Sequence, residues 1–580
     1  MTDQSRTLAK ADGLAARNRI PAAAQLYRSL LTQPAGSPEI AARAGLGLAI
    51  LAARQGNMAA ARNAVREALQ RDPALLDGWR LLADIEDRAG RADAALDAAR
   101  RIADLAPVDA DCQIALGYAA TRAGALGIAE RAYRRALDLE PGSAAAVNNL
   151  AGVLQQRGRA GEAAELFQSI VADDPTNARA WANLALVREM LNDLGGARDA
   201  AGRALSVQQD QPVMRLLLAQ IDFREGKPAE ALDAVETLIA GAADPTVLAE
   251  AINLKGHLLD RQGDYDAALA AFKEAGARRR TLGARAGVDR RRYMAELRRA
   301  AAVFTPKRLT GLAAEEAPAG TAVAPIFFVG FPRSGTTLLE TVLAAHPDLV
   351  TSGERSPLQM LRPEIARTAG PSARYPDIVP DLPAEAIGRL RALFAEIAAD
   401  EFGATLEGRR LLDKLPLNIV ELPLVRRLFP NAKVIVALRD PRDVCLSAFM
   451  QHFAQNDAMA NFTDLGATAA LYDGVMGLWL RYRRDLRLDH FEYRYEDLVR
   501  DPQAVLGPLF EWLGLAWDSD LLERRGEVAA RHVATPSRDA VNRPITAGRV
   551  ARHRHYARAL APLMEILSPY IAEFGYERVD

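Results

Sequence analysis

Small apolar residues recur at a fixed step through the N-terminal half of the chain, with polar and larger apolar positions between them. Six alanines keep a spacing of 34 residues without interruption: Ala61, Ala95, Ala129, Ala163, Ala197 and Ala231. Prolines follow about twelve residues later at four places: Pro73, Pro107, Pro141 and Pro175. Small residues let two helices approach closely, and proline ends a helix. The pattern therefore predicts a repeated pair of helices joined by a turn.

The repeated pattern continues beyond these positions at both ends. Tyr27 belongs to a degenerate unit over about residues 3–40. Gly256 and Phe272 belong to a last unit that follows an insertion of three residues. Residues 1–277 are therefore expected to form about eight units. This pattern resembles the tetratricopeptide repeat, a helix–turn–helix unit of 34 residues.

The resemblance implies an all-α superhelix whose concave face is suited to peptides or partner proteins. We expect a protein or peptide to bind on this face. A purely architectural role for the repeats is the alternative, because a fold alone does not establish a ligand.

The end of the repeats has a different composition. Residues 278–304 are rich in arginine and helical in pattern, which indicates a capping helix. Residues 305–325 (TPKRLTGLAAEEAPAGTAVAP) have the Gly, Pro and Ala content that is typical of a linker. We therefore assign residues 278–324 to a capping helix and linker, and residues 325–580 to a second domain.

The second domain alternates short β-rich runs with helical patterns. The expected strands are Ile326–Val329, Leu349–Ser352, Lys433–Leu438 and Phe491–Tyr495. Strands separated by helices predict an α/β fold with a parallel sheet covered by helices on both faces. In such sheets ligands bind at the carboxyl ends of the strands.

Composition and charge exclude some classes of function. The 580 residues include 25% charged and 49% hydrophobic residues, which is ordinary for a globular protein of two or three domains. A net charge of −1 gives no general reason to expect nucleic-acid binding. The two cysteines, Cys112 and Cys445, predict no disulfide framework. The sequence begins without a signal peptide and contains no run of about 18 apolar residues, so we expect a cytoplasmic protein with no membrane span.

The most informative stretch joins the first expected strand to a helix. Residues 330–337 read GFPRSGTT, with the G-x-x-x-x-G spacing of a nucleotide-binding loop. Thr336 stands where a nucleoside triphosphatase has its lysine. The cationic side chain of this loop is instead Arg333, which lies before the second glycine. Arginine and the hydroxyls of Ser334, Thr336 and Thr337 suit a 5′-phosphate group held at a helix N-terminus. The loop lacks the lysine that a triphosphate-driven switch requires.

This loop resembles the 5′-phosphosulfate loop of sulfotransferases that use 3′-phosphoadenosine 5′-phosphosulfate (PAPS). The tyrosylprotein sulfotransferases and their bacterial relatives with N-terminal tetratricopeptide repeats are the most similar branch. His346-Pro347-Asp348 and Gly353-Glu354 continue the similarity, which covers about residues 324–580. The resemblance implies that Arg333, Ser334, Gly335, Thr336 and Thr337 bind PAPS.

A second stretch, residues 434–449 (VIVALRDPRDVCLSAF), carries Arg439 at a strand end and Ser447 eight residues later. This spacing resembles the site at which the family holds the 3′-phosphate of PAPS. The alternative is an Arg–Asp pair that closes the strand, with Ser447 as an ordinary helix residue.

Two further residues have catalytic counterparts in the family. Sulfuryl transfer needs a base for the acceptor's proton and a cation for the charge on the leaving oxygen. The resemblance implies Glu354 as the general base and Lys414 as the cation, and it requires neither a metal nor a covalent enzyme intermediate. Their alternatives are a surface glutamate and a solvated lysine. Cytosolic small-molecule sulfotransferases use a histidine base instead, for which His452 and His490 are the candidates.

The family also places residues from the last part of the chain at the cofactor. Tyr495 is similar to a family tyrosine near PAPS, although a core tyrosine on a strand is the alternative. Ser537 and Arg543 resemble contacts of a late segment that folds over the nucleotide. Gln451 departs from the tyrosylprotein branch, which has a basic residue at this position.

The expected function is transfer of the sulfuryl group of PAPS to an acceptor hydroxyl. A protein or peptide tyrosine that docks on the repeats is the favoured acceptor, and a carbohydrate, lipid or small-molecule hydroxyl is the competing one. In that case deletion of residues 1–300 weakens acceptor binding more than cofactor binding. A repeat scaffold with an inactive nucleotide-binding domain is the alternative from another class. No pattern indicates the oligomeric state.

Overall fold

The structure is a computed structural model, and it describes residues 3–32, 37–241, 244–312, 324–368, 375–525 and 550–577. The chain divides into two compact units, Met1–Ser169 and Ile170–Asp580. In the described residues, helical repeats precede a parallel sheet with helices, which confirms the expected all-α plus α/β fold class. None of the helices in these residues combines the length and the apolar character that a membrane crossing requires.

The first unit is built from consecutive helix pairs. Its helices are α1 (Asp3–Ala16), α2 (Ile20–Leu31), α3 (Pro38–Arg54), α4 (Met58–Arg71), α5 (Leu76–Arg88), α6 (Ala92–Leu105), α7 (Ala110–Arg122), α8 (Leu126–Leu139), α9 (Ala144–Gln156) and most of α10 (Ala160–Asp173). Ala61, Ala95 and Ala129 are all buried. A Cβ atom on Gly117 would come within 2.5 Å of the Tyr133 ring, so the small residue allows the close approach that the spacing predicts.

The turns of the helix pairs share a left-handed backbone conformation. In the first unit four glycines with positive φ keep the 34-residue step: Gly56, Gly90, Gly124 and Gly158. Asn192 and Gly226 continue this step in the second unit. Glycine adopts positive φ without steric cost, and asparagine tolerates it. The repeat therefore marks its turns with Gly or Asn, a signal that adds to the alanine register.

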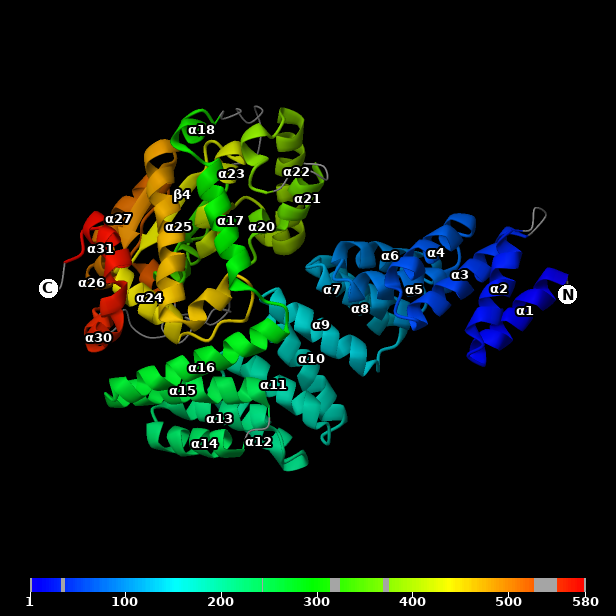
Figure 1. Ribbon diagram of the computed structural model, residues 1–580. Coiled ribbons are helices and arrows are strands. Elements are labelled where there is room, and N and C mark those ends of the chain that lie inside the picture. The colour runs from blue at the N-terminus through cyan, green and yellow to red at the C-terminus, as the bar shows by residue number, and fades with distance from the viewer. Residues whose placement is uncertain are drawn as a thin grey trace. The chain divides into compact units, whose positions relative to one another are not determined.

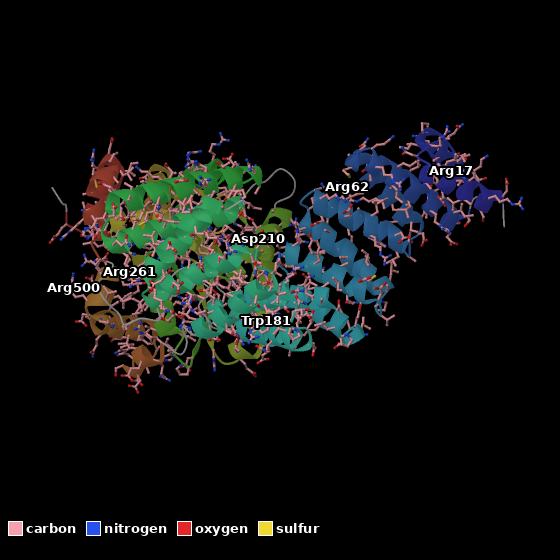
Figure 2. All side chains as sticks on the ribbon, turned by 90° about the horizontal axis from the view of Figure 1, so that it is seen from below. Arg17, Arg62, Trp181, Asp210, Arg261 and Arg500 are labelled. Atoms are coloured by element: carbon pink, nitrogen blue, oxygen red, sulfur yellow. The ribbon has the colours of Figure 1, made fainter. Side chains whose placement is uncertain are left out.

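The second unit begins with the remaining repeats. Their helices are α11 (Ala178–Met190), α12 (Leu194–Val207), α13 (Pro212–Glu225), α14 (Pro228–Gly241), α15 (Pro245–Gln262) and α16 (Tyr265–Arg285). The indole nitrogen of Trp181, labelled in Figure 2, donates to the Pro175 carbonyl at 2.9 Å. Trp79 makes the same bond to Pro73 at 2.9 Å in the first unit. Over the described residues, α1 to α16 are sixteen successive helices, the number that eight helix–turn–helix units require.

The segment expected to cap the repeats is divided between two helices. α16 continues to Arg285, and α17 (Arg290–Val303) lies against α25 (Leu465–Asp485) (Figure 1). Leu297 of α17 is buried in the core on one face of the sheet. The short helix α18 (Pro306–Thr310) follows, and residues 313–323 of the expected linker lie outside the described residues. α17 therefore packs as part of the C-terminal core.

The sheet has five parallel strands in the order β2-β3-β1-β4-β5. They are β1 (Ile326–Gly330), β2 (Leu349–Thr351), β3 (Arg410–Lys414), β4 (Lys433–Leu438) and β5 (Asp489–Arg494). Four of them match expected strands within two residues at each end. β3 was not predicted, because only Leu411 and Leu412 among its five residues are apolar. Tyr495 was placed at the end of a strand, and it is instead the first residue of a helix.

Helices cover both faces of this sheet. Phe327 and Val329 of β1 join one core with α17 and α25, and Ile326 and Phe328 join the other. The remaining helices are α19 (Thr336–Leu343), α20 (Pro357–Met360), α21 (Arg362–Thr368), α22 (Ala384–Phe402), α23 (Leu422–Leu428), α24 (Pro441–Met450), α26 (Tyr495–Arg500), α27 (Pro502–Leu513), α30 (Ala557–Leu560) and α31 (Met564–Glu573). The doubly covered parallel sheet agrees with the expected architecture.

The eighth repeat, α15 and α16, shares a core with the sheet domain. Phe272 of α16 packs in one cluster with Leu446 and Phe449 of α24. A Cβ atom on Gly276 would lie 2.3 Å from the backbone oxygen of Thr463, so α16 is in close contact with this part of the chain. Deletion of residues 1–300 would therefore remove part of the C-terminal core along with the repeats.

Candidate active site

The loop after β1 has a path that only glycine allows at two positions. A Cβ atom on Gly330 would lie 2.8 Å from the Ala437 backbone oxygen and 2.9 Å from Ser334 Oγ. Gly335 has a φ of 92°, and a Cβ atom there would lie 2.4 Å from the Tyr495 ring. The loop is therefore held between β4 and the first turn of α26.

Arg333 lies at the centre of this loop with a φ of 74°, which is uncommon for a residue other than glycine. Its Nε donates to Ser447 Oγ at 3.4 Å. Arg439 Nη1 donates to the Arg333 carbonyl at 3.0 Å, and the Arg439 guanidinium lies 4.8 Å from the centre of the Tyr495 ring. Four residues that were expected to bind PAPS are thus brought together from the loop after β1, the end of β4, α24 and α26.

The hydroxyls of the loop line the N-terminus of α19. Thr336 and Thr337 are 5% exposed and Ser334 is 1% exposed. Within the part of the chain that the structure describes, Ser334 Oγ is buried without a hydrogen-bond partner. A buried hydroxyl and the first N–H groups of a helix are suited to phosphate oxygens. The loop therefore fits an anionic group such as the 5′-phosphosulfate of PAPS. Ser537 and Arg543 lie outside the described residues.

Glu354 and Lys414 lie close together although 60 residues separate them in sequence. β3 ends at Lys414, and Glu354 follows the neighbouring strand β2. Lys414 Nζ lies 3.4 Å from Glu354 Oε1. The Lys414 side chain is fully buried, whereas 48% of the Glu354 side chain is exposed. Lys414 is therefore not a solvated surface lysine.

A second carboxylate, which the sequence analysis did not find, also contacts Lys414. Glu340 of α19 lies with its Oε2 3.0 Å from Lys414 Nζ and is buried. Burial alone would lower the pKa of Lys414, but Glu340 and Glu354 outweigh this effect and raise the pKa above its ordinary value. Lys414 is therefore a charged ammonium at neutral pH. An acidic residue inside the apolar helix TTLLETVL is the signal that could have identified Glu340.

Asp413 fixes the loop that carries Glu354. Its carboxylate accepts hydrogen bonds from Ser356 Oγ at 3.0 Å and from the Leu358 N–H at 3.3 Å. Asn418 Nδ2 adds a third donor at 3.3 Å. Burial raises the pKa of Asp413 to about 6, although the hydrogen bonds from Ser356 and Leu358 oppose the shift. The end of β3 therefore carries Lys414, and its Asp413 forms hydrogen bonds with the chain just after Glu354.

Asp443 anchors a later segment of the chain to α24. Its carboxylate accepts from the backbone N–H groups of Ala551 and His553, both at 2.7 Å, and lies 2.9 Å from His553 Nδ1. Burial alone would raise the pKa of Asp443, but His553 and Arg439 lower it below its ordinary value. Asp443 lies one helical turn before Ser447, so the segment at 551–553 is attached next to the Arg439 and Ser447 group.

The two candidate histidines lie in other surroundings. His452 Nε2 is 3.5 Å from Glu250 of α15, and burial together with Arg279 lowers the pKa of His452 to about 4. His490 lies on β5, where its Nδ1 is 3.1 Å from the Leu488 carbonyl. His452 therefore faces the eighth repeat.

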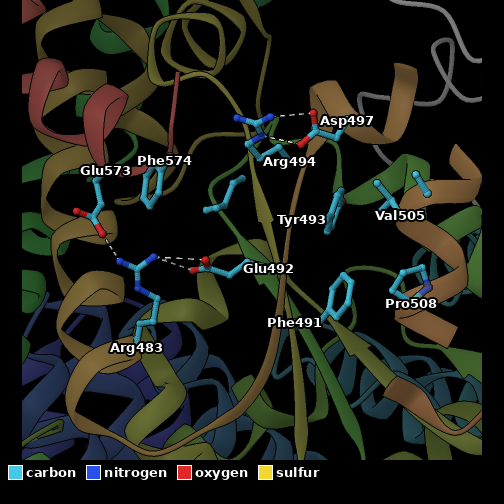
Figure 3. Close-up of a pocket in the computed structure, with 12 residues that line it drawn as sticks. Arg483, Phe491, Glu492, Tyr493, Arg494, Asp497, Val505, Pro508, Glu573 and Phe574 are labelled. Atoms are coloured by element: carbon cyan, nitrogen blue, oxygen red, sulfur yellow. Dashed lines mark hydrogen bonds and ion pairs between the residues drawn. The ribbon is translucent and has the colours of Figure 1, made fainter. Parts of the chain in front are cut away.

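A cavity of about 440 Å³ lies at β5, the edge strand of the sheet (Figure 3). Its charged side chains pair with one another: Arg483 with Glu492 and Glu573, and Arg494 with Asp497 at 2.6 Å. Its lining contains no residue of the loop 330–337. This cavity is therefore distinct from the loop that carries Arg333 and from the pair of Glu354 and Lys414.

Two kinds of protein family match the chain. Residues 325–519 match a family described as "Sulfotransferase family". Residues 8–75, 46–110, 120–187 and 249–275 match tetratricopeptide repeat families. These matches confirm the two resemblances on which the sequence analysis depends.

Individual relatives agree with these matches. A putative protein-tyrosine sulfotransferase of Caenorhabditis briggsae is 35% identical over 223 residues, which are 35% of this chain and 70% of that protein. Protein-tyrosine sulfotransferase 2 of Gallus gallus is 25% identical over 43% of this chain and 69% of its own length. An uncharacterized protein of Aquifex aeolicus is 28% identical over 355 residues and 60% of this chain. The chain spans 46% of that protein's length.

Proposed function

The chain belongs to the sulfotransferase family, and we propose that it transfers the sulfuryl group of PAPS to a tyrosine hydroxyl of a protein or peptide. The observation that carries this proposal is the pair of Glu354 and Lys414 at the carboxyl ends of neighbouring strands. The protein-tyrosine sulfotransferases among its relatives support tyrosine as the acceptor. Carbohydrate, lipid and small-molecule hydroxyls remain the alternative acceptors.

The residues around Arg333 would hold PAPS. Arg333, Ser334, Gly335, Thr336 and Thr337 would contact its 5′-phosphosulfate, since the loop offers a cation, hydroxyls and helix N–H groups. Arg439 and Ser447 would contact its 3′-phosphate, with Tyr495 packed beneath Arg439. Ser537 and Arg543 stay predicted contacts.

Glu354 and Lys414 would perform separate parts of the transfer. Glu354 takes the proton of the acceptor hydroxyl, and its half-exposed side chain is accessible to an acceptor. When bound, PAPS supplies the sulfuryl group, and cleavage of its S–O bond releases 3′,5′-ADP with the electron pair of that bond. The charged Lys414 offsets the negative charge that develops on the leaving oxygen.

We expect the protein to sulfate tyrosine-containing peptides when it is supplied with PAPS. Mass spectrometry would detect one added sulfuryl group on a peptide with a single tyrosine, and the same peptide with phenylalanine serves as the control. Sulfation of a saccharide or small phenol without sulfation of any peptide would agree with a sulfotransferase but contradict tyrosine as the acceptor. Absence of transfer to every acceptor would contradict the proposal.

The repeats contribute more than a docking surface in this account. Asn253 of α15 donates to the Met450 carbonyl at 3.0 Å, and Arg279 of α16 donates to the Gln451 carbonyl at 2.9 Å. Met450 is the last residue of α24, the helix that carries Ser447. Because the last carbonyls of a helix lack partners within it, the eighth repeat stabilises the end of α24.

We therefore expect Asn253→Ala to weaken both folding and 3′,5′-ADP binding. Removing the donor takes one hydrogen bond from the buried Met450 carbonyl, which costs about 0.5–1.5 kcal/mol in the free energy of unfolding. Urea unfolding and calorimetric titration of the full-length protein measure the two effects. Asn148→Ala is the matched control, because Asn148 is half-buried and donates to a carbonyl of its own helix. Identical behaviour of the two variants would mean that the eighth repeat does not support the cofactor site.

A further inference from the structure

Lys414 has two carboxylate partners with opposite exposure. Glu340 is the nearer one, at 3.0 Å against 3.4 Å for Glu354. The Glu340 side chain is 7% exposed, while that of Glu354 is 48% exposed. A buried ammonium needs a buried counter-ion, because a half-exposed carboxylate is screened by water. The two carboxylates are therefore not equivalent.

We propose that Glu340 is the positioning residue of the site: it is the permanent counter-ion that keeps Lys414 charged and in place, and it thereby leaves Glu354 free to act as the base. The role in transfer rests on the proposed function, whereas the ion pair itself does not. Glu340 is too deeply buried to receive the proton of an acceptor hydroxyl. It acts through Lys414.

Hydrogen bonds extend from Glu340 to the chain that precedes Glu354. Thr351 Oγ1 donates to Glu340 Oε1 at 2.5 Å, and the Gly353 N–H donates to Thr351 Oγ1 at 3.2 Å. One carboxylate oxygen of Glu340 thus contacts Lys414, and the other is bonded to the end of β2. Glu340 fixes the lysine from one side and the start of the Glu354 loop from the other.

A site with Glu354 as the lone counter-ion would have conflicting requirements. A carboxylate that is committed to a buried ammonium is a poorer acceptor for a proton, because the positive charge favours its ionised form. With Glu340 in place, Glu354 can turn toward an acceptor without leaving Lys414 unpaired. Asp413, the neighbouring charged residue in β3, bonds to Ser356 and Asn418 and therefore does not take the place of Glu340 as a counter-ion of Lys414.

Glu340→Gln in the full-length protein tests the counter-ion by the pH dependence of its stability. The raised pKa of Lys414 stabilises the folded wild type below about pH 10.5, the ordinary lysine pKa, and this contribution is lost as the pH rises through the higher folded pKa. Without Glu340, burial is expected to lower the folded pKa below the ordinary value. The variant should therefore have a lower free energy of unfolding in urea than wild type. This difference should be largest near pH 7 and should become smaller toward pH 10.

Two further variants keep this test decisive. Thr351→Val, which removes only the hydroxyl link, should show a loss that is independent of pH. The double variant Glu340→Gln/Lys414→Met should recover stability relative to Glu340→Gln, because it removes a buried charge that has lost its nearer counter-ion. If Glu340→Gln does not fold, a folded double variant would still show that the charge of Lys414 causes the instability. A loss of stability in Glu340→Gln that does not depend on pH would contradict the proposal that Glu340 is the counter-ion of Lys414. A double variant that is as unstable as the single one would also contradict it.

The role in transfer is tested separately. Glu340→Gln should lower kcat at least tenfold, with the KM for the acceptor and the Kd for 3′,5′-ADP within about twofold of wild type. If kcat is unchanged while stability shows the expected pH dependence, Glu340 is the counter-ion of Lys414 but has no positioning role in transfer. Failure of wild type to bind 3′,5′-ADP would contradict the proposed function but leave the stability result interpretable.

Discussion

Glu354→Gln is expected to lower kcat for sulfuryl transfer by about 10²–10⁴-fold, the usual contribution of a positioned general base. The amide keeps the shape of the carboxylate and can still accept a hydrogen bond from Lys414, but it cannot take the proton of an acceptor hydroxyl. Because the Glu354 side chain is 48% exposed, we expect little change in folding stability. Binding of 3′,5′-ADP should remain within about twofold of wild type, since Arg333, Arg439 and Ser447 are unchanged.

Steady-state kinetics with a tyrosine peptide, together with calorimetric titration of 3′,5′-ADP, would measure both quantities. Glu385→Gln is the matched control, because Glu385 is an exposed glutamate on α22. Full activity in Glu354→Gln, with loss of activity in His452→Asn, would replace the carboxylate base by a histidine base. The pKa of about 4 at His452 makes that histidine a weak proton acceptor, which is why we favour Glu354.

The repeats could be predicted from sequence because each unit contacts its neighbours through the same few positions. Ala61, Ala95 and Ala129 are buried for the same reason in successive units, so one packing requirement appears as a period in the sequence. The strands β1 and β4 were also predictable, since they are buried on both faces and read as continuous apolar runs.

Other features depend on residues that are distant in sequence. β3 ends in Asp413 and Lys414, two charged residues that have the appearance of a surface segment. Their burial is possible only because Glu340 pairs with Lys414, and Ser356 and Asn418 bond to Asp413. No local pattern reveals such partners. For the same reason α17 was expected to cap the repeats, although its apolar residues pack into the C-terminal core.

Arg439→Ala is expected to remove the preference for a 3′-phosphate. Arginine forms charge-assisted hydrogen bonds with phosphate, and the loss of one such contact costs about 1.5–3 kcal/mol, or roughly 10- to 150-fold in Kd. Arg439 also donates to the Arg333 carbonyl, so the substitution could disturb the loop as well as the 3′-phosphate contact. The comparison with 5′-AMP separates these effects, because a disturbed loop weakens both ligands whereas a lost 3′-phosphate contact weakens only 3′,5′-ADP.

Calorimetric binding of 3′,5′-ADP to the wild-type protein and to Arg439→Ala, with 5′-AMP and Mg-ATP as controls, tests the central claim most directly. The account predicts that wild type binds the bisphosphate much more tightly than either control. It also predicts that Arg439→Ala binds 3′,5′-ADP no better than 5′-AMP. Equal binding of 3′,5′-ADP and 5′-AMP by wild type would contradict the use of PAPS, and the function would then have to be sought on the tetratricopeptide repeats.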